Sequence, residues 1–251
     1  MTTLIIPCAG KSSRFPNMKP KWMLTHPNGN LMVQESLNGL DLKKFDRIII
    51  TVVKEHSINH DAKLVLEQAF DIKNNKKIEI LELDDFTTSQ SQTVFETLKK
   101  KKVKGSFVVK DSDNFVKFKI KSFSEFVVGL DINKFPKEVL RLKSKSFLVK
   151  NDQNIITDII EKKISSENIC LGVYGFSDPE KFVIAYNALS KQNQKGEIYL
   201  SHIIFYLIAS RKSIYNYIEA EDFEDWGTLQ DWRNTQIAHS TYFVDIDGVL
   251  L

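Results

Sequence analysis

Short apolar runs alternate with longer amphipathic segments over the first half of this chain, and this alternation restricts the folds open to it. Four runs bounded by turn-forming residues are expected to be strands: Leu4–Pro7, Arg47–Val53, Ile78–Leu83 and Ser106–Lys110. Three segments between them have the period of helices: Leu31–Leu40, Asp61–Phe70 and Gln90–Lys101. Strand, helix and strand in succession predict an α/β fold whose mostly parallel central sheet has helices on both faces.

The pattern changes after about residue 115, where shorter extended runs predict a smaller antiparallel region. Two runs look extended, Phe126–Ile132 and Val139–Leu142, and a hairpin is expected from Ser146–Lys150 and Ile155–Ile160. Further on, the sequence predicts helices over Asp178–Leu189 and Leu200–Ser210 and a strand over Ile214–Ala220. We expect one domain over residues 1–240, with its two halves meeting near residue 115.

The overall charge gives no sign of a nucleic-acid or membrane partner. The 251 residues carry a net charge of +3, with 27% charged side chains, which is ordinary for a globular protein. The segment Met1–Pro7 has no basic start and too short an apolar run for a signal peptide, so a cytoplasmic protein is expected. The two cysteines, Cys8 and Cys170, lack a metal-site spacing and are expected to be buried.

A small-residue loop follows the first expected strand. Gly10 would let backbone N–H groups approach phosphate oxygens, and Ser12, Ser13 and Arg14 would add donors. The loop matches neither the Walker A pattern nor the dinucleotide fingerprint, and taken alone it could be a plain turn. Because ligands of such sheets bind beyond the carboxyl ends of the strands, its position favours a phosphate site.

Two lysines separated by a proline strengthen this interpretation. The rigid ring of Pro20 holds Lys19 and Lys21 in a fixed relation. We expect Lys21 to stabilise charge that develops on an α-phosphate, and Arg14 to hold the β- and γ-phosphates.

Two aspartates from distant segments are candidate Mg²⁺ ligands. Asp113 follows the strand expected at Ser106–Lys110, and Asp225 opens Asp225-Trp226-Gly227-Thr228. Mg²⁺ is commonly held by one or two carboxylates together with phosphates and water. The alternatives are a turn aspartate at 113 and, at 225, an aspartate near a helix N-terminus capped by Thr228.

Eight short motifs together resemble the nucleotidyltransferases of the glycosyltransferase-A-like type, which activate sugar phosphates, phosphocholine and related phosphates. The matching segments occur in the family's order: Ala9–Arg14, Lys19–Lys21, Thr88–Thr93, Asp113-Asn114, Glu161-Lys162, Gly172–Tyr174, Gly196-Glu197 and Asp225–Thr228. The resemblance implies a Rossmann-like nucleotidyltransferase fold, with a nucleotide-binding half and an acceptor-binding half.

The resemblance also implies roles for individual residues. Arg14 and Lys21 are expected to be catalytic, and Asp113 and Asp225 to hold Mg²⁺. The nucleotide would contact Ala9, Gly10, Lys11, Ser12, Ser13, Ser89, Gln90 and Asp111. The acceptor would contact Glu161, Lys162, Tyr174 and Glu197.

The reaction implied is attack of a phosphate monoester on the α-phosphorus of a nucleoside triphosphate, with release of pyrophosphate. CTP is the expected nucleotide, and L-glutamine phosphate, used in modification of a capsular polysaccharide, the expected acceptor. Phosphocholine and sugar 1-phosphates are the alternatives. A homo-oligomer is compatible with the resemblance, and nucleic-acid and membrane partners are not expected.

The sequence departs from the family pattern in two places. Ser12 stands where relatives carry a second glycine, and Lys163 follows Lys162 where sugar-phosphate enzymes carry proline. The second departure weakens the inference of a sugar acceptor.

Two other functions fit parts of the same sequence. A glycosyltransferase of this fold would use Asp111-Ser112-Asp113 as its Asp-x-Asp motif, but it has little use for Lys21 near an α-phosphate. A non-catalytic relative would not need to keep Arg14, Lys21, Asp113 and Asp225 together.

A further motif lies at the end of the sequence. The segment Thr241–Leu250 contains Asp245-Ile246-Asp247-Gly248-Val249, which resembles the first motif of haloacid-dehalogenase-type phosphatases. Only four residues follow Asp247, so we expect either the stump of a fused domain or a structural strand, without phosphatase activity, rather than a second functional domain.

Overall fold

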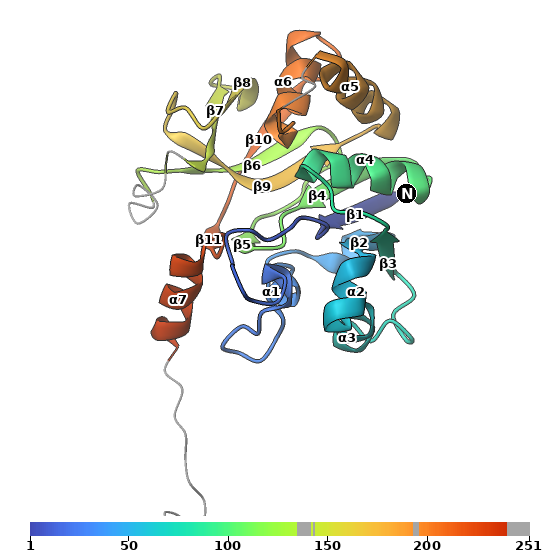
Figure 1. Cartoon of the computed structure of the whole chain (residues 1–251). Coiled ribbons are helices and arrows are strands. Elements are labelled where there is room, and N and C mark those ends of the chain that lie inside the picture. The colour runs from blue at the N-terminus through green and yellow to red at the C-terminus, as the bar shows by residue number, and fades with distance from the viewer. Residues whose placement is uncertain (135–141, 143, 193–195, 240–251) are drawn as a thin grey trace, which may run out of the picture.

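The computed structural model describes residues 1–134, 142, 144–192 and 196–239. A nine-stranded sheet runs through the molecule in the order β3-β2-β1-β4-β9-β6-β10-β8-β7 (Figure 1). Its strands are β1 (Thr2–Pro7), β2 (Arg47–Val53), β3 (Ile78–Leu83), β4 (Ser106–Lys110), β6 (Phe126–Asp131), β7 (Ser146–Lys150), β8 (Ile155–Glu161), β9 (Asn168–Phe176) and β10 (Tyr215–Glu219).

The strands expected in the first half are confirmed, and they form a parallel block. Strand β1 pairs in parallel with β2 and β4, and β2 pairs in parallel with β3. Within β1 the side chains of Leu4 and Ile6 enter one apolar cluster while Ile5 enters another. Because both faces of the sheet are buried here, the sequences of these strands are nearly continuous apolar runs.

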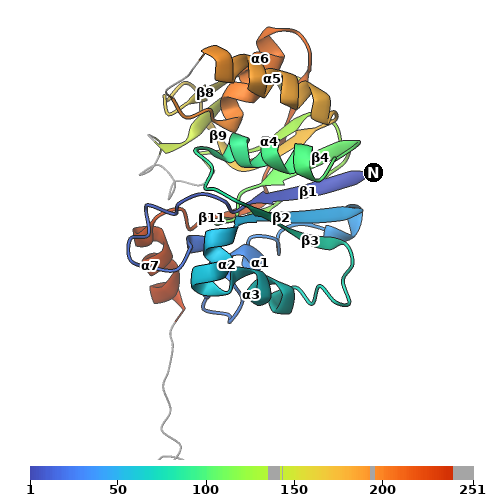
Figure 2. The same ribbon diagram turned by 45° about the vertical axis from the view of Figure 1, so that its right-hand side comes forward.

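Helices cover both faces of this block (Figure 2). The helices are α1 (Met32–Glu35), α2 (Lys54–His60), α3 (Ala62–Ala69), α4 (Gln90–Lys100), α5 (Pro179–Gln192), α6 (Leu200–Ala209) and α7 (Leu229–Ala238), with short 3₁₀ turns at Lys21–Met23 and Leu42–Lys44. Val33 of α1 and Leu66 of α3 pack with Leu4 and Ile6, whereas Val94 of α4 and Ile203 of α6 pack with Ile5.

The sheet as a whole is mixed, so the predicted predominance of parallel pairing is not confirmed. Strand β9 lies between β4 and β6 and is antiparallel to both. Strands β7 and β8 form the expected antiparallel hairpin, and β10 joins β6 in parallel and β8 antiparallel. The sequence pattern identifies strands, but it does not give the direction in which a strand such as β9 enters the sheet.

A separate two-stranded ribbon joins two distant parts of the chain. Strand β5 (Asn114–Lys117) pairs antiparallel with β11 (Asp222–Asp225), with Asn114 opposite Asp225. Beyond the last pair, the Trp226 N–H donates to the Asp113 carbonyl at 2.9 Å. The ribbon therefore fixes residues 113 and 225 side by side.

Helix α7 follows this ribbon, and its start at Thr228 is the helix N-terminus given above as the alternative role for Asp225. Thr228 is its N-cap and accepts from the Asp231 N–H, while the Asp231 carboxylate accepts from the Thr228 N–H at 3.1 Å. Such a reciprocal pair satisfies N–H groups that the helix leaves without partners.

Some expected elements differ from the structure. Instead of a helix over Leu31–Leu40, the chain forms the short α1 and then a series of turns that includes Gly39. A side chain at Gly39 would run into the backbone of Val116, so the chain needs a glycine here for its close approach to β5. The expected strand Val139–Leu142 and the motif after residue 240 fall on residues outside the described ranges, apart from Leu142.

Both cysteines are free and buried, as expected. Within the described ranges, every helix is too short or too polar to cross a membrane.

Candidate functional site

A cleft of about 1380 Å³ opens where β1 and β4 end. Its walls come from the loop after β1, the start of α4, the turn after β4, the facing ends of β7 and β8, and the segment before α7. The cleft is lined by every predicted site residue except Ala9, which is fully buried beneath it. The fold thus brings together residues that are far apart in the sequence, such as Gly10 and Asp225.

The loop after β1 has the shape that its small residues suggest. The space beside Gly10 is open, since a Cβ atom there would meet no atom within 4 Å. Ser12 has a φ of +50°, in the left-handed region that glycine prefers, so this position keeps a glycine-like conformation although its residue is serine. Its hydroxyl accepts the Lys21 N–H at 3.2 Å, which ties the loop to the lysine segment.

An apolar cluster anchors this loop against the ribbon. Phe15, next to Arg14, is buried with Trp226, the neighbour of Asp225, and with Trp232 of α7. Packing of Phe15 and Trp226 in one cluster holds Arg14 and Asp225 at the same end of the cleft.

Lys21 and Asp113 form an ion pair in the cleft. Burial is the largest single influence on the pKa of the Asp113 carboxyl and by itself would raise it. Together with the charges of Arg14 and Lys110, the Lys21 ammonium lowers the pKa to about 2. Asp113 is therefore a carboxylate at neutral pH.

Asp225 lies beside Asp113 and has its own lysine partner. Lys145 pairs with it, and the charge of Lys145 lowers the Asp225 pKa although burial alone would raise it. A Cβ atom placed on Gly227 would lie 2.9 Å from Asp225 Oδ1 and 3.4 Å from Asp113 Oδ2. The same point is 3.7 Å from Arg14 Nη1, so two carboxylates and a guanidinium converge there.

The donor set at this point suits a hard divalent cation. Two ionised carboxylates face a shared space, and the two ammonium groups of Lys21 and Lys145 now supply the positive charge that balances them. In the part of the chain that the structure describes, no cluster of three or more His, Cys, Asp or Glu side chains could hold a metal. Two carboxylates are nevertheless enough for Mg²⁺ when phosphates and water complete its coordination.

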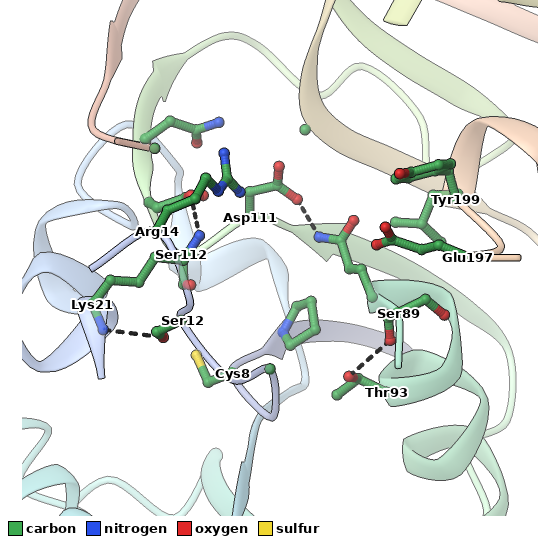
Figure 3. A pocket seen from close by; sticks show the side chains of 18 of the residues that line it. Cys8, Ser12, Arg14, Lys21, Ser89, Thr93, Asp111, Ser112, Glu197 and Tyr199 are labelled. Atoms are coloured by element: carbon green, nitrogen blue, oxygen red, sulfur yellow. Dashed lines mark hydrogen bonds and ion pairs between the residues drawn. The ribbon is translucent and has the colours of Figure 1, made fainter. Parts of the chain in front are cut away.

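Asp111 lies between this end of the cleft and the start of α4 (Figure 3). Its carboxylate accepts a hydrogen bond from the Gln90 side chain. Burial, followed by the nearby charge of Asp113, raises its pKa to about 6. Gly172, with a φ of +72°, passes so close to Asp111 that a Cβ atom at residue 172 would clash with the carboxylate.

Ser89 caps the N-terminus of α4 by accepting the Gln92 N–H at 3.1 Å. This cap fixes the start of the helix on the wall that carries Gln90. In Figure 3 Arg14 and Lys21 lie on one side of Asp111, whereas Ser89, Glu197 and Tyr199 lie on the other.

The far end of the cleft combines acidic groups, hydroxyls and one lysine. The Glu161 carboxylate accepts from the hydroxyls of Ser146 and, at 2.6 Å, Ser201. Lys162 donates to the Tyr199 hydroxyl at 2.5 Å, and this hydrogen bond raises the Lys162 pKa. A ligand group that is cationic or carries hydroxyls would find partners here.

Lys110 was not predicted as a functional residue, and it supports the cleft from behind the lining residues. Its side chain is fully buried, and burial lowers its pKa to about 8. The ammonium donates to the carbonyls of Asp111 at 2.6 Å and Asn114 at 2.9 Å, so it holds the turn that carries Asp113. The sequence did contain one sign of this role, because Lys110 is a charged residue at the end of the apolar run that forms β4.

Other missed residues have no local motif. Lys145, Ser146, Tyr199 and Ser201 line the cleft, but each lies in a segment whose sequence gives no sign of a ligand.

No family model matches the sequence, and no curated protein is similar to it in sequence. Solved structures do match. A nucleoside-diphosphate-sugar pyrophosphorylase from Vibrio cholerae RC9 superposes with a TM-score of 0.75 and 22% identity, over 92% of this chain and 98% of the other. An inositol-1-phosphate CTP transferase from T. maritima has a TM-score of 0.70 and 12% identity, over 94% of each chain.

A UDP-glucose pyrophosphorylase bound to UDP-glucose has a TM-score of 0.69 and 14% identity, over 95% of this chain and 98% of the other. At these identities the likeness establishes the fold alone, which this chain shares with two pyrophosphorylases and a CTP transferase.

Proposed function

We propose that this protein is a Mg²⁺-dependent cytidylyltransferase that joins CTP to a phosphate monoester and releases pyrophosphate. The observation that carries the proposal is the convergence of Asp113, Asp225 and Arg14 around one point, with Lys21 paired to Asp113. Cations for a triphosphate and carboxylates for a metal thus share one end of a cleft. The other end offers partners for a second substrate.

The reaction needs no covalent enzyme intermediate. An oxygen of the acceptor phosphate forms a bond to the α-phosphorus of CTP, and the bond from that phosphorus to the bridging oxygen of the β-phosphate breaks. Pyrophosphate carries away the electron pair. Positioning and charge neutralisation would supply most of the acceleration.

The residues at the loop end would hold the triphosphate. Lys21 would neutralise charge on the α-phosphate, and Arg14 would bind the leaving pyrophosphate through its forked donors. Backbone N–H groups beside the open space at Gly10 would approach the phosphates, with Lys11, Ser12 and Ser13 adding donors. Asp113 and Asp225 would hold Mg²⁺, which when bound neutralises phosphate charge.

The nucleoside would lie along the wall formed by the start of α4. Ser89, Gln90 and Asp111 offer polar groups there, and the hydrogen bond from Gln90 to Asp111 fixes the orientation of both side chains. The choice of CTP follows from the sequence resemblance, and the T. maritima structure supports it because its name describes a CTP transferase of this fold.

For the acceptor we favour L-glutamine phosphate, which would give CDP-L-glutamine for modification of a capsular polysaccharide. An amino-acid phosphate carries an ammonium group, which Glu161 and Glu197 suit, and a phosphate, which Lys162 suits. Tyr174 would add contact area. Phosphocholine is the alternative with the same charge pattern, followed by the sugar 1-phosphates.

A pyrophosphate-release screen tests the proposal. Four nucleoside triphosphates would each be combined with L-glutamine phosphate, phosphocholine and hexose 1-phosphates, with and without Mg²⁺. We expect release only when CTP, Mg²⁺ and an acceptor are all present, and fastest release with L-glutamine phosphate. Transfer of a sugar from a nucleotide-sugar, without formation of pyrophosphate, would instead make the protein a glycosyltransferase.

A further inference from the structure

We propose that Lys145 binds the acceptor phosphate and, before that, competes with the divalent ion for Asp225. This inference rests on the proposed function, because it takes Asp225 to be a metal ligand. It adds a residue that no sequence motif identifies.

The ion pair between Lys145 and Asp225 is well shielded from water. The Lys145 side chain is 15% exposed and that of Asp225 is 13% exposed. The Lys145 ammonium also lies 5.3 Å from the centre of the Phe223 ring, on the ribbon strand that carries Asp225. A pair of opposite charges with little solvent around it interacts more strongly than a pair on the surface.

A metal ion in the shared space would lie close to this ammonium, because Lys145 pairs with Asp225 Oδ2 while Oδ1 of the same carboxylate faces that space. Asp225 and Asp113 face a shared space, and among the described residues Lys145 pairs with Asp225 and Lys21 with Asp113. A divalent cation placed between the carboxylates would repel both ammonium groups at short range. Repulsion between the ion and the ammonium therefore opposes binding of the ion and favours movement of Lys145 away from Asp225.

The surroundings of Lys145 indicate where its ammonium goes. The Lys145 carbonyl accepts the Lys162 N–H at 3.0 Å, and the next residue, Ser146, donates to Glu161. Lys145 thus lies between the metal end and the acceptor end of the cleft. Its flexible four-carbon side chain suits such a move, and the nearest anion that the substrates bring to this end is the acceptor phosphate.

This arrangement links binding of the ion to binding of the acceptor. Without substrate, Lys145 weakens metal binding at Asp225. With the acceptor present, the ammonium has a new anionic partner and the metal binds more tightly. By thermodynamic reciprocity the ion then strengthens acceptor binding by the same factor.

The experiment measures metal binding without any turnover. Mn²⁺ alone is titrated into the protein, and free Mn²⁺ is followed by its electron paramagnetic resonance signal. We expect Lys145→Met to bind Mn²⁺ about tenfold more tightly than the native protein, since a shielded competing charge is removed. Lys145→Arg keeps a cation and should bind Mn²⁺ as weakly as the native protein does.

Lys150→Met is the matched control. Lys150 lies at the other end of β7, where its ammonium donates to the Asn154 side chain at 2.7 Å and does not line the cleft. This variant should bind Mn²⁺ as the native protein does. In kinetic assays Lys145→Met should raise the KM for the acceptor at least about tenfold, with little change in the KM for CTP.

Several outcomes would overturn the inference. Asp225→Asn is expected to weaken Mn²⁺ binding; if it does so while Lys145→Met matches Lys150→Met, then Lys145 does not compete and the proposed function still stands. If Lys145→Met binds Mn²⁺ more tightly but keeps the native KM for the acceptor, then Lys145 does not bind the acceptor phosphate. If Asp225→Asn leaves Mn²⁺ binding unchanged, the metal site itself is wrong. A second substitution, Lys145→Gln, and the Tm of each variant show whether misfolding of one variant accounts for its result.

Discussion

The Lys21 ammonium lies against Asp113 at the end of the cleft where the triphosphate is proposed to bind. We expect Lys21→Ala to lower kcat by about 10²–10³ because charge on the α-phosphate loses its partner. Steady-state pyrophosphate release measures this effect. Lys54→Ala is the control, since Lys54 is exposed and pairs with Asp84 outside the cleft. Native-like turnover in a folded Lys21→Ala protein would remove Lys21 from the reaction.

A second prediction concerns Gly172, where space and backbone conformation both require glycine. In Gly172→Ala the new methyl group would push against the Asp111 carboxylate and would sit on a backbone with a φ of +72°. We expect a loss of about 1–3 kcal/mol in stability and a higher KM for CTP. Urea unfolding and nucleotide kinetics measure the two effects.

Gly10→Ala provides the comparison, because the space beside Gly10 is open and its φ is not positive. Its loss of stability should be well below that of Gly172→Ala. Equal stability of the two variants would show that the contact with Asp111 does not constrain residue 172.

At the scale of single residues, the sequence was informative where function is encoded locally. Arg14, Lys21 and Asp113 each belong to a short motif after a strand, so their places in the cleft could be expected. Lys145 could not be expected, because its importance comes from the partner across the cleft and not from its neighbours in sequence.

At the scale of elements, one ion cluster joins three of them. Glu79 of β3 accepts from Arg47 of β2 and, at 2.9 Å, from Lys101 at the end of α4. The hydrogen bond from Arg47 is the main reason that the Glu79 pKa falls from 4.5 to about 2. The ionised form therefore stabilises the fold above about pH 4.5, and this stabilisation is lost as the pH falls through about 2.

We expect Glu79→Gln to lower the free energy of unfolding by about 1 kcal/mol at pH 7, a value reduced for solvent screening because the side chain is one-third exposed. The difference between the variant and the native protein should shrink as the pH is lowered from about 4.5 to 2. Urea unfolding over that range measures it. A difference that stays constant with pH would exclude the ionised carboxylate as its cause.

The elements differ in how well sequence defines them. Strands β2, β3 and β4 coincide with apolar runs that are bounded by turn-forming residues, so their first and last residues could be predicted. Strands β5 and β11 have four residues each, too few to show a period. They exist because they pair with each other across the chain, and such pairing has no local signal.

At the scale of the whole molecule, both halves contribute to the cleft, so a ligand that fills it should stabilise the entire fold. With Mg²⁺ and CTP at about 100 times the dissociation constant, we expect about 2.7 kcal/mol of added stability, or a rise in Tm of about 5–10 °C. Differential scanning calorimetry measures it. Asp113→Asn should abolish the part of the rise that depends on Mg²⁺. A Tm unaffected by Mg²⁺ and CTP would argue against nucleotide binding.

The α/β fold class and the joining of distant motifs in one cleft could be predicted at this scale, but the mixed sheet could not. Strand β9 is apolar throughout its centre, as a parallel or an antiparallel inner strand would be. Its direction follows from the path of the chain between β8 and α5, which the sequence does not describe.

The β5–β11 ribbon also has a consequence for how the protein is made. A growing chain that has emerged through Glu219 contains every strand of the nine-stranded sheet, yet it still lacks Asp225. Because β11 follows every strand of that sheet in the chain, the two aspartates come together only after the scaffold that receives them has been synthesised. Nascent protein should therefore fold before it can turn over substrate.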